Sequence, residues 1–162
     1  MTVQEKTMEM MEYEDELHVN IISGLSCRTG WHFDADTGSC YAIPTGAEGS
    51  WAEAMAYCGA LGGELAIVES AGEHRFLVSL INTTKAAYPH DKDFWIGAVD
   101  ILEEGVFIWA YRLSEVENFF WGRGEPNNQN GGQGCLRMES ELAWAWGDGD
   151  CTSKEYFICE RE

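Results

Sequence analysis

The stretch "SWAEAMAYCGALGG", residues 50–63, predicts an α-helix with a defined start and a defined end. Ser50 and Glu53 have the spacing of a capping box, in which two side chains bond to free backbone N–H groups at the start of a helix. Helix-forming residues follow, and Gly62 and Gly63 are typical stop signals. We therefore expect a helix here that carries Cys58.

The stretch "SAGEHRFLVSLIN", residues 70–82, repeats this pattern. Ser70 and Glu73 form a second pair at capping-box spacing. The residues that share one face at helical spacing are Glu73, Phe76, Leu77, Leu80 and Ile81. We expect a second helix here.

Beyond residue 93 the pattern changes to short apolar runs, which are typical of β-strands. They are "FWIGAV" at 94–99, "GVFIWAY" at 105–111 and, after a long region rich in Gly, Asn and Trp, "YFICE" at 156–160. Two helices followed by strands predict an α+β fold.

Length and charge limit the class of protein. The chain has 162 residues, which fit one domain with a real core. Its formal net charge of -18 argues against binding to nucleic acid or to an anionic membrane surface, because phosphates attract Lys and Arg. No apolar run approaches the length of a membrane span. The acidic surface has two interpretations, a solvated surface and a site for a partner.

The number of cysteines indicates the cellular compartment in which the protein folds. The chain has 6 cysteines, at 27, 40, 58, 135, 151 and 159, and an even count predicts disulfides made in an oxidising environment. We therefore expect a secreted, extracellular protein, and Asn82 in the triplet Asn82-Thr83-Thr84 is a candidate glycosylation site. Residues 1–26 lack the features of a signal peptide, so we expect the numbering to begin at a mature or engineered end.

Residues 1–26 form a candidate acidic arm, followed by a domain at residues 27–162. Acids interspersed with methionines dominate residues 5–16, a composition typical of disorder. The run "LHVNII" at 17–22 then alternates apolar and polar residues as a strand does. This run has two interpretations, docking on a sheet edge of the same chain or on that of a neighbour in a homo-oligomer.

Sequence motifs of enzymes give no support for catalysis. The triplet "DTG" at 36–38 is found in aspartic proteases, but their chemistry needs two carboxylates that share a proton across a cleft. The chain contains no H-E-x-x-H, P-loop or G-x-S-x-G motif, and its 4 histidines are scattered. We expect a protein that is not an enzyme.

The order of these motifs resembles the C-type lectin-like domain over residues 27–160. The matching pieces run from "CRTGWHF" at 27–33, through both helix motifs, "WIG" at 95–97 and "EPNN" at 125–128, to "FICE" at 157–160. The resemblance implies two helices, antiparallel strands and a long loop region that binds calcium and sugar. It implies the long form of the domain, which has an N-terminal hairpin.

The resemblance also implies a disulfide pairing, which the cysteine count alone leaves open among about fifteen connectivities. The implied pairs are Cys27–Cys40, Cys58–Cys159 and Cys135–Cys151. Four tryptophans match core positions of the family: Trp51, Trp95, Trp109 and Trp121. For Trp146 two roles are open, packing in the core and stacking of its indole face on a sugar ring.

The loop "EPNNQNGGQGC", residues 125–135, corresponds to the family's calcium and sugar site. The resemblance implies that a Ca²⁺ ion and the sugar are held there by Glu125, Asn127, Gln133 and Asp148, with Trp146 as a further sugar contact and a cis bond before Pro126. The order Glu-Pro-Asn goes with mannose, glucose and N-acetylglucosamine in this family. We therefore expect a calcium-dependent lectin for such glycans, with a role in recognising microbial glycans in innate immunity.

Several positions depart from the family's pattern. Gln133 replaces a carboxylate, and Gly147 replaces an asparagine, which weakens the calcium site without excluding it. Asn128 and Gly134 stand where an auxiliary calcium site has acids. The alternatives are a protein- or mineral-binding module with a degenerate calcium site and a calcium-independent lectin of altered sugar choice.

The departures at Gln133 and Gly147 lead to a hypothesis about how the calcium site could be strengthened. Restoring the family's residues, by Gln133→Glu and Gly147→Asn, should tighten calcium and mannose binding. The alternatives are that Gly147 uses a backbone conformation closed to Asn, or that Asp150 or Glu139 has become a ligand.

Overall fold

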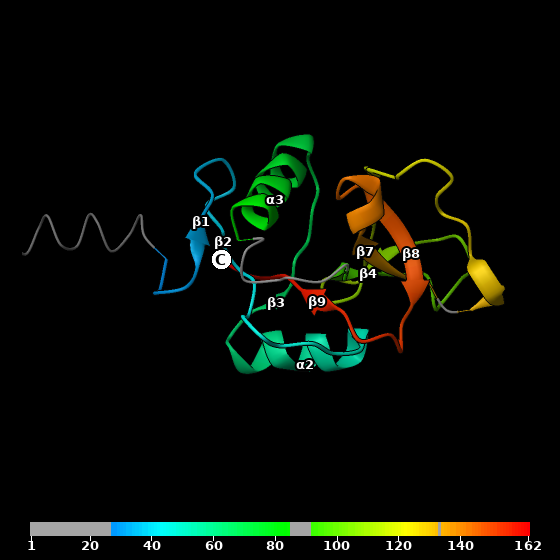
Figure 1. Cartoon of the computed structure of the whole chain (residues 1–162), viewed down its shortest axis with the longest axis horizontal. Coiled ribbons are helices and arrows are strands. Elements are labelled where there is room, and N and C mark those ends of the chain that lie inside the picture. The colour runs from blue at the N-terminus through cyan, green and yellow to red at the C-terminus, as the bar shows by residue number, and fades with distance from the viewer. Residues whose placement is uncertain (1–26, 85–91, 133) are drawn as a thin grey trace, which may run out of the picture.

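The computed structural model describes residues 27–84, 92–132 and 134–162, and the side chain of residue 130 is not described. The expected acidic arm with its alternating run, and Gln133, lie outside these residues. Within the described ranges both predicted helices are present, α2 (Trp51–Ala60) and α3 (Ala71–Thr84) (Figure 1). Each begins at its predicted cap, because Ser50 Oγ accepts Glu53 N–H at 3.2 Å and Ser70 Oγ accepts Glu73 N–H at 3.1 Å.

The cap of α3 offers a test of the helix assignment. Replacing Ser70 by alanine should cost about 1 kcal/mol of unfolding free energy, because the Glu73 N–H then loses its acceptor. The matched control is Ser79→Ala in the exposed middle of the same helix, which should change stability by less than about 0.5 kcal/mol. Urea denaturation of both variants checks this, and equal losses would contradict the capping role.

One sheet joins the two ends of the described chain. Its strands, in spatial order, are β1 (His32–Phe33), β2 (Cys40–Ala42), β10 (Cys159–Arg161) and β3 (Glu64–Leu65), all antiparallel. The "DTG" triplet lies in the turn between β1 and β2. The implied N-terminal hairpin is therefore present, and its base is closed by the Cys27–Cys40 disulfide.

A second sheet carries the loop region. Its main path runs β6 (Ser114–Glu115), β5 (Ile108–Trp109), β4 (Phe94–Val99), β7 (Gly134–Met138) and β8 (Trp146–Asp150), with β9 (Tyr156–Phe157) parallel to β4. The run "GVFIWAY" forms only a two-residue strand. The disulfides Cys58–Cys159 and Cys135–Cys151 are present as the resemblance implied.

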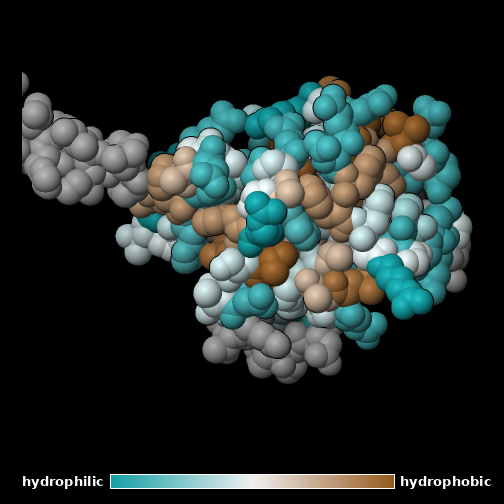
Figure 2. Space-filling view, turned by 90° about the horizontal axis from the view of Figure 1, so that it is seen from above, coloured by the Kyte–Doolittle hydropathy of each residue, from teal (hydrophilic) through white to brown (hydrophobic). Residues whose placement is uncertain are grey.

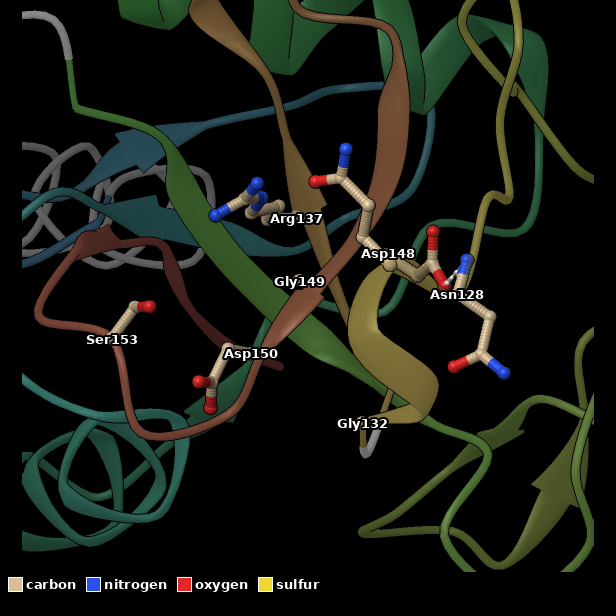
Figure 3. A pocket seen from close by; sticks show the side chains of 8 residues that line it. Asn128, Gly132, Arg137, Asp148, Gly149, Asp150 and Ser153 are labelled. Carbon is tan, nitrogen blue, oxygen red and sulfur yellow. Dashed lines mark hydrogen bonds between the residues drawn. The ribbon is translucent and has the colours of Figure 1, made fainter.

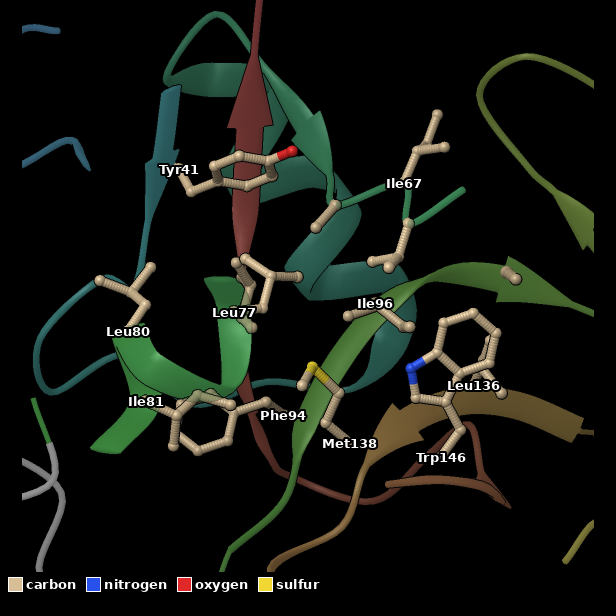
Figure 4. Close-up of a cluster of buried hydrophobic side chains, with 14 of the residues drawn as sticks. Tyr41, Ile67, Leu77, Leu80, Ile81, Phe94, Ile96, Leu136, Met138 and Trp146 are labelled. Atoms are coloured by element: carbon tan, nitrogen blue, oxygen red, sulfur yellow. The ribbon is translucent and has the colours of Figure 1, made fainter. Parts of the chain in front are cut away.

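The core lies between α3 and this second sheet. Figure 4 shows Leu77, Leu80 and Ile81 of α3 near side chains from β4, β7 and β8. Trp95 and Trp109 are buried as expected, whereas Trp51 and Trp121 are half-buried. No helix in the described part of the chain is long and apolar enough to cross a membrane.

The structure corrects one role considered for Trp146. Trp146, which Figure 4 shows within the core, is 0% exposed. Its ring packs edge-on against Trp109, Phe120 and Trp121. Because no indole face reaches solvent, Trp146 cannot stack on a sugar ring, and it serves the core instead.

Candidate functional site

Three of the residues implied by the resemblance come together where the loop after residue 124 meets β8. Glu125 and Pro126 are joined by a cis peptide bond, and the loop continues into a 3-10 turn at Gln129–Gly131. Asp148 lies in the middle of β8, where only 9% of its surface is exposed. The loop and the strand are thereby brought into direct contact.

Asp148 organises this contact. Its Oδ1 accepts the backbone N–H of Asn127 and its Oδ2 accepts that of Asn128, both at 2.9 Å. Glu125 Oε1 accepts the side-chain amide of Asn127 at 2.6 Å, and Glu125 Oε2 accepts the Asp148 N–H at 3.4 Å. Glu125, Asn127 and Asp148 therefore form one hydrogen-bonded group.

The electrostatics of this group favour a cation. Burial, a side-chain hydrogen bond with Asp148 and the charge of Glu139 raise the pKa of Glu125 to about 7 from 4.5. A carboxylate whose ionised form is disfavoured by negative neighbours gains most when a positive ion is present. The group offers the hard carboxylate and amide oxygens that calcium prefers, so its donor chemistry fits the family's ion.

The number of charged donors is small, however. No three His, Cys, Asp or Glu side chains among the described residues converge closely enough to hold a metal. The group instead combines two carboxylates with the amide of Asn127, and each carboxylate has about four lone-pair positions. Gln133, the fourth residue implied by the resemblance, lies outside the described residues.

The space beside Gly147 is already filled. A Cβ built on Gly147 would lie 2.0 Å from Glu139 Oε1 and 2.4 Å from Glu139 Cδ, distances far shorter than any non-bonded contact. Gly147 lies within β8 and is not one of the glycines with a left-handed backbone. The hypothesis that Gly147→Asn alone repairs the site is therefore at odds with this geometry, for a steric reason and not a backbone one.

The space beside Gly134 is filled in the same way. A Cβ on Gly134 would lie 2.4 Å from Asp100 Oδ1. The Asp100 carboxylate, on a residue that is 5% exposed, accepts the N–H groups of Gly134 at 3.0 Å and Gly105 at 3.1 Å. At the position where the family has an acid of the auxiliary calcium site, this chain has Gly134, whose N–H donates a hydrogen bond to Asp100.

Arg137 of β7 lies beside β8, where it is paired with Gly147. Its Nε contacts Glu139 Oε1 at 3.1 Å and Asp93 Oδ2 at 3.3 Å, and its Nη1 contacts Glu155 Oε1 at 3.5 Å. A Cβ on Gly149 would lie 2.7 Å from Arg137 Nε, so this glycine makes room for the guanidinium. Glycines in a strand often mark such a close approach, and Gly147 and Gly149 were the sequence signal for this cluster.

A polar hollow lies beside the loop (Figure 3). Its volume is about 180 Å³, and its lining combines amides, carboxylates, a guanidinium and a hydroxyl, from Asn128, Gln129, Gly132, Arg137, Asp148, Gly149, Asp150 and Ser153. Figure 3 shows Arg137 and Asp148 on the strand side and the turn bearing Gly132 opposite. Mixed donors and acceptors of this kind suit a neutral molecule with many hydroxyl groups.

Asn82, the candidate glycosylation site, is exposed near the end of α3. Its Oδ1 accepts the indole N–H of Trp144 at 3.1 Å.

Comparisons with known proteins agree with the fold and with a carbohydrate-binding role. The family model described as the lectin C-type domain matches residues 47–161. Salivary C-type lectin 2 of Aedes albopictus is 33% identical over 117 residues, which cover 70% of this chain and 78% of that protein. Perlucin of Haliotis laevigata is 33% identical over 138 residues, which cover 84% and 83%. The crystal structure of the cow CD23 carbohydrate-recognition domain, determined in the presence of a GlcNAc2Man3 oligosaccharide, is 28% identical with a TM-score of 0.69, over 84% of this chain and 95% of that one.

Proposed function

Because this chain belongs to the C-type lectin domain family, a family of non-enzymatic carbohydrate-binding domains, we propose that it is a secreted, calcium-dependent lectin for glycans of the mannose and N-acetylglucosamine class. One observation supports this most strongly. Glu125, Asn127 and Asp148 come from two separate segments and lie within hydrogen-bond distance of one another, in the Glu-Pro-Asn order.

The residues have distinct roles in this proposal. Glu125, Asn127, Asp148 and the amide of Gln133 would supply oxygens to a bound calcium ion. Such an ion would supply the positive charge that attracts the hydroxyl oxygens of a sugar. Glu125 accepts a hydrogen bond from a hydroxyl and Asn127 donates one, which fixes the orientation of the sugar.

Charge narrows the class of glycan further. Arg137 is already paired with three carboxylates, and the chain carries a net charge of -18. Sialylated or sulfated glycans would meet this negative surface, and the described residues that line the hollow include no Lys or Arg side chain other than Arg137. We therefore expect neutral glycans to be preferred.

Affinity for one sugar should be low. A single sugar in a shallow site binds near millimolar, about 4 kcal/mol, and each hydrogen bond to a charged group contributes roughly 1.5 to 3 kcal/mol. Loss of one family ligand therefore matters, and several copies on one glycan surface would compensate through avidity. Dense microbial glycans provide such a surface, which suits a role in innate immunity.

A calcium-independent lectin is the second candidate, supported by a specific observation. Asp148 accepts both loop N–H groups, and Asp100 accepts the N–H of Gly134, so protein hydrogen bonds alone close the loop at both ends. A loop closed in this way does not need an ion to keep its shape.

A glycan array separates the two candidates. The proposal predicts binding to mannose- and N-acetylglucosamine-terminated glycans in millimolar calcium and its loss in EDTA. Binding that persists in EDTA would establish the second candidate instead. Galactose-terminated glycans are the specificity control and should give no signal.

The proposal predicts a pH dependence of calcium binding. The raised pKa of Glu125, about 7, means that this carboxyl group is protonated in the metal-free protein below that pH and must release its proton to bind calcium. Calcium affinity should therefore fall by up to about tenfold per pH unit below 7 and level off above about 8.

The raised pKa of Glu125 should also make the stability of the metal-free protein depend on pH, in the direction opposite to calcium affinity. Because the folded pKa of Glu125 lies above 4.5, the metal-free protein loses stability as pH rises from 4.5 to 7, and calcium should offset this loss. Calorimetry between pH 5.5 and 8.5 on wild type and Glu125→Gln checks both. A pH slope of calcium affinity that survives in the variant would assign the proton to another group.

A further inference from the structure

Asn82 begins the triplet Asn82-Thr83-Thr84, the only match to the N-glycosylation pattern in the chain. Helix α3 ends at Thr84, so Asn82 lies in its last turn, and its side chain is exposed. The three disulfides among the described residues are typical of an oxidising compartment such as the secretory pathway. Such triplets arise often by chance, so the surroundings of Asn82 decide whether the site can carry a glycan.

The side-chain amide of Asn82 has a defined orientation. Its Oδ1 accepts the indole N–H of Trp144 at 3.1 Å. An indole nitrogen can only donate, so the amide turns its oxygen towards Trp144 and its nitrogen away. This nitrogen, Nδ2, is the atom that carries the sugar in an N-linked glycan, and it donates no hydrogen bond to any described residue. A glycan on Nδ2 therefore leaves the bond to Trp144 intact.

Asn118 has the opposite orientation. It is also exposed, but its Nδ2 donates to the backbone oxygen of Glu69 at 3.0 Å. Two phenylalanines follow it, so it does not begin a glycosylation triplet. Because its amide nitrogen is used within the fold, Asn118 is a matched control for Asn82.

The backbone holds Trp144 in an uncommon conformation. Ala143 and Trp144 have φ angles of 53° and 69°, in the left-handed region that bulky L residues seldom adopt. The Trp144 N–H donates to Glu139 O at 2.8 Å, and its ring packs edge-on with that of Phe94. Residues held in this way often have a role beyond packing. The indole stays half-buried, so part of its apolar surface is open to a ligand.

The face of the molecule that carries α3 also has apolar surface to cover. Figure 2 views the molecule from this side and shows hydrophobic residues lying among hydrophilic ones. The apolar face of a sugar ring can pack on an aromatic side chain, whose ring is apolar as well. The Asn82 side chain already contacts Trp144, so the first sugar on Asn82 starts within reach of the indole.

We propose that Asn82 carries an N-linked glycan and that its first N-acetylglucosamine packs on the indole of Trp144. This inference rests on the secreted location in the proposed function, but not on calcium or sugar binding by the loop. The transfer joins Asn82 Nδ2 to C1 of the first sugar of a lipid-linked oligosaccharide diphosphate. The N–C1 bond forms, the bond from C1 to the diphosphate oxygen breaks, the lipid diphosphate leaves, and the amide releases one proton.

Mass spectrometry of the full chain, secreted from eukaryotic cells, tests the attachment. The wild type should carry one oligosaccharide, which peptide-N-glycosidase should remove. Asn82→Gln and Thr84→Ala should be unmodified, whereas Asn118→Gln and Thr83→Ala should still carry the glycan. An unmodified wild type in the medium would overturn the site. It would leave the lectin proposal standing, because this assay measures neither calcium nor sugar binding.

Melting temperatures test the contact with Trp144. Endoglycosidase H trims a high-mannose glycan to the single N-acetylglucosamine on Asn82, and tunicamycin gives the same chain with no sugar. The trimmed protein should melt about 2 to 4 °C above the sugar-free protein. In Trp144→Ala the trimmed and sugar-free forms should melt at the same temperature. A difference of equal size in Trp144→Ala, or no difference in the wild type, would overturn the contact.

Discussion

Asp148→Ala should abolish detectable sugar binding and lower calcium affinity by more than about hundredfold, the largest functional effect we expect from one substitution. Asp148 is the residue on which the loop and the strand meet. Its two oxygens accept the N–H groups of Asn127 and Asn128, and the proposal gives it a metal-ligand role as well. The substitution removes all of these interactions at once.

Stability separates the two roles of Asp148. Loss of two hydrogen bonds to a charged acceptor should cost about 2 to 4 kcal/mol of unfolding free energy in EDTA. Asp34 is a matched control, since it is 6% exposed and also accepts two local hydrogen bonds, from Asp36 N–H and Thr37 Oγ1. Asp34→Ala should cost stability but leave calcium affinity unchanged. Wild-type calcium affinity in folded Asp148→Ala would remove Asp148 from the ligand set.

Arg137→Met should cause the largest loss of stability that we expect at a charged residue, about 3 kcal/mol. The substitution leaves the carboxylates of Asp93, Glu139 and Glu155 without their shared cation, and their side chains are only 16%, 14% and 12% exposed. Uncompensated charges in such positions are costly, because water cannot fully solvate them.

Arg112→Met is the control for the Arg137 prediction. Arg112 also pairs with carboxylates, Glu69 at 3.5 Å and Glu162 at 2.8 Å, but these partners are 54% and 79% exposed. Its loss should cost less than about 1 kcal/mol, since surface ion pairs contribute little. Guanidinium denaturation is unsuitable because its salt screens charges, so urea is the denaturant of choice. Equal losses for the two arginines would contradict the role assigned to the Arg137 cluster.

Much of the fold could be predicted because its signals are local. Ser50 and Ser70 mark the starts of the two helices, because each side chain can accept a hydrogen bond from the backbone N–H three residues later. The structure contains both hydrogen bonds. The run at 94–99 forms the predicted strand β4, whereas the run at 105–111 contributes only a two-residue strand. Strand length depends on which neighbours are present to pair with, and the sequence of one strand does not contain this information.

Part of the candidate site could also be predicted from sequence, and part of it could not. The Glu-Pro-Asn motif and Asp148 could be aligned with a known pattern, and the structure brings these residues into contact. The overlap of Glu139 with the side-chain position at Gly147 depends on how a turn folds back onto a strand. From sequence, Glu139 was only one of several alternatives. The buried state of Trp146 likewise depends on packing by Trp109, Phe120 and Trp121, from other segments.

A crystal structure of the protein with calcium and methyl α-mannoside tests the central claim most directly. We expect one ion about 2.3 to 2.6 Å from oxygens of Glu125, Asn127 and Asp148, with the 3- and 4-hydroxyls of the sugar completing its shell. A sugar bound elsewhere, or bound at the loop with no ion between it and these residues, would contradict a calcium-dependent sugar site at this loop.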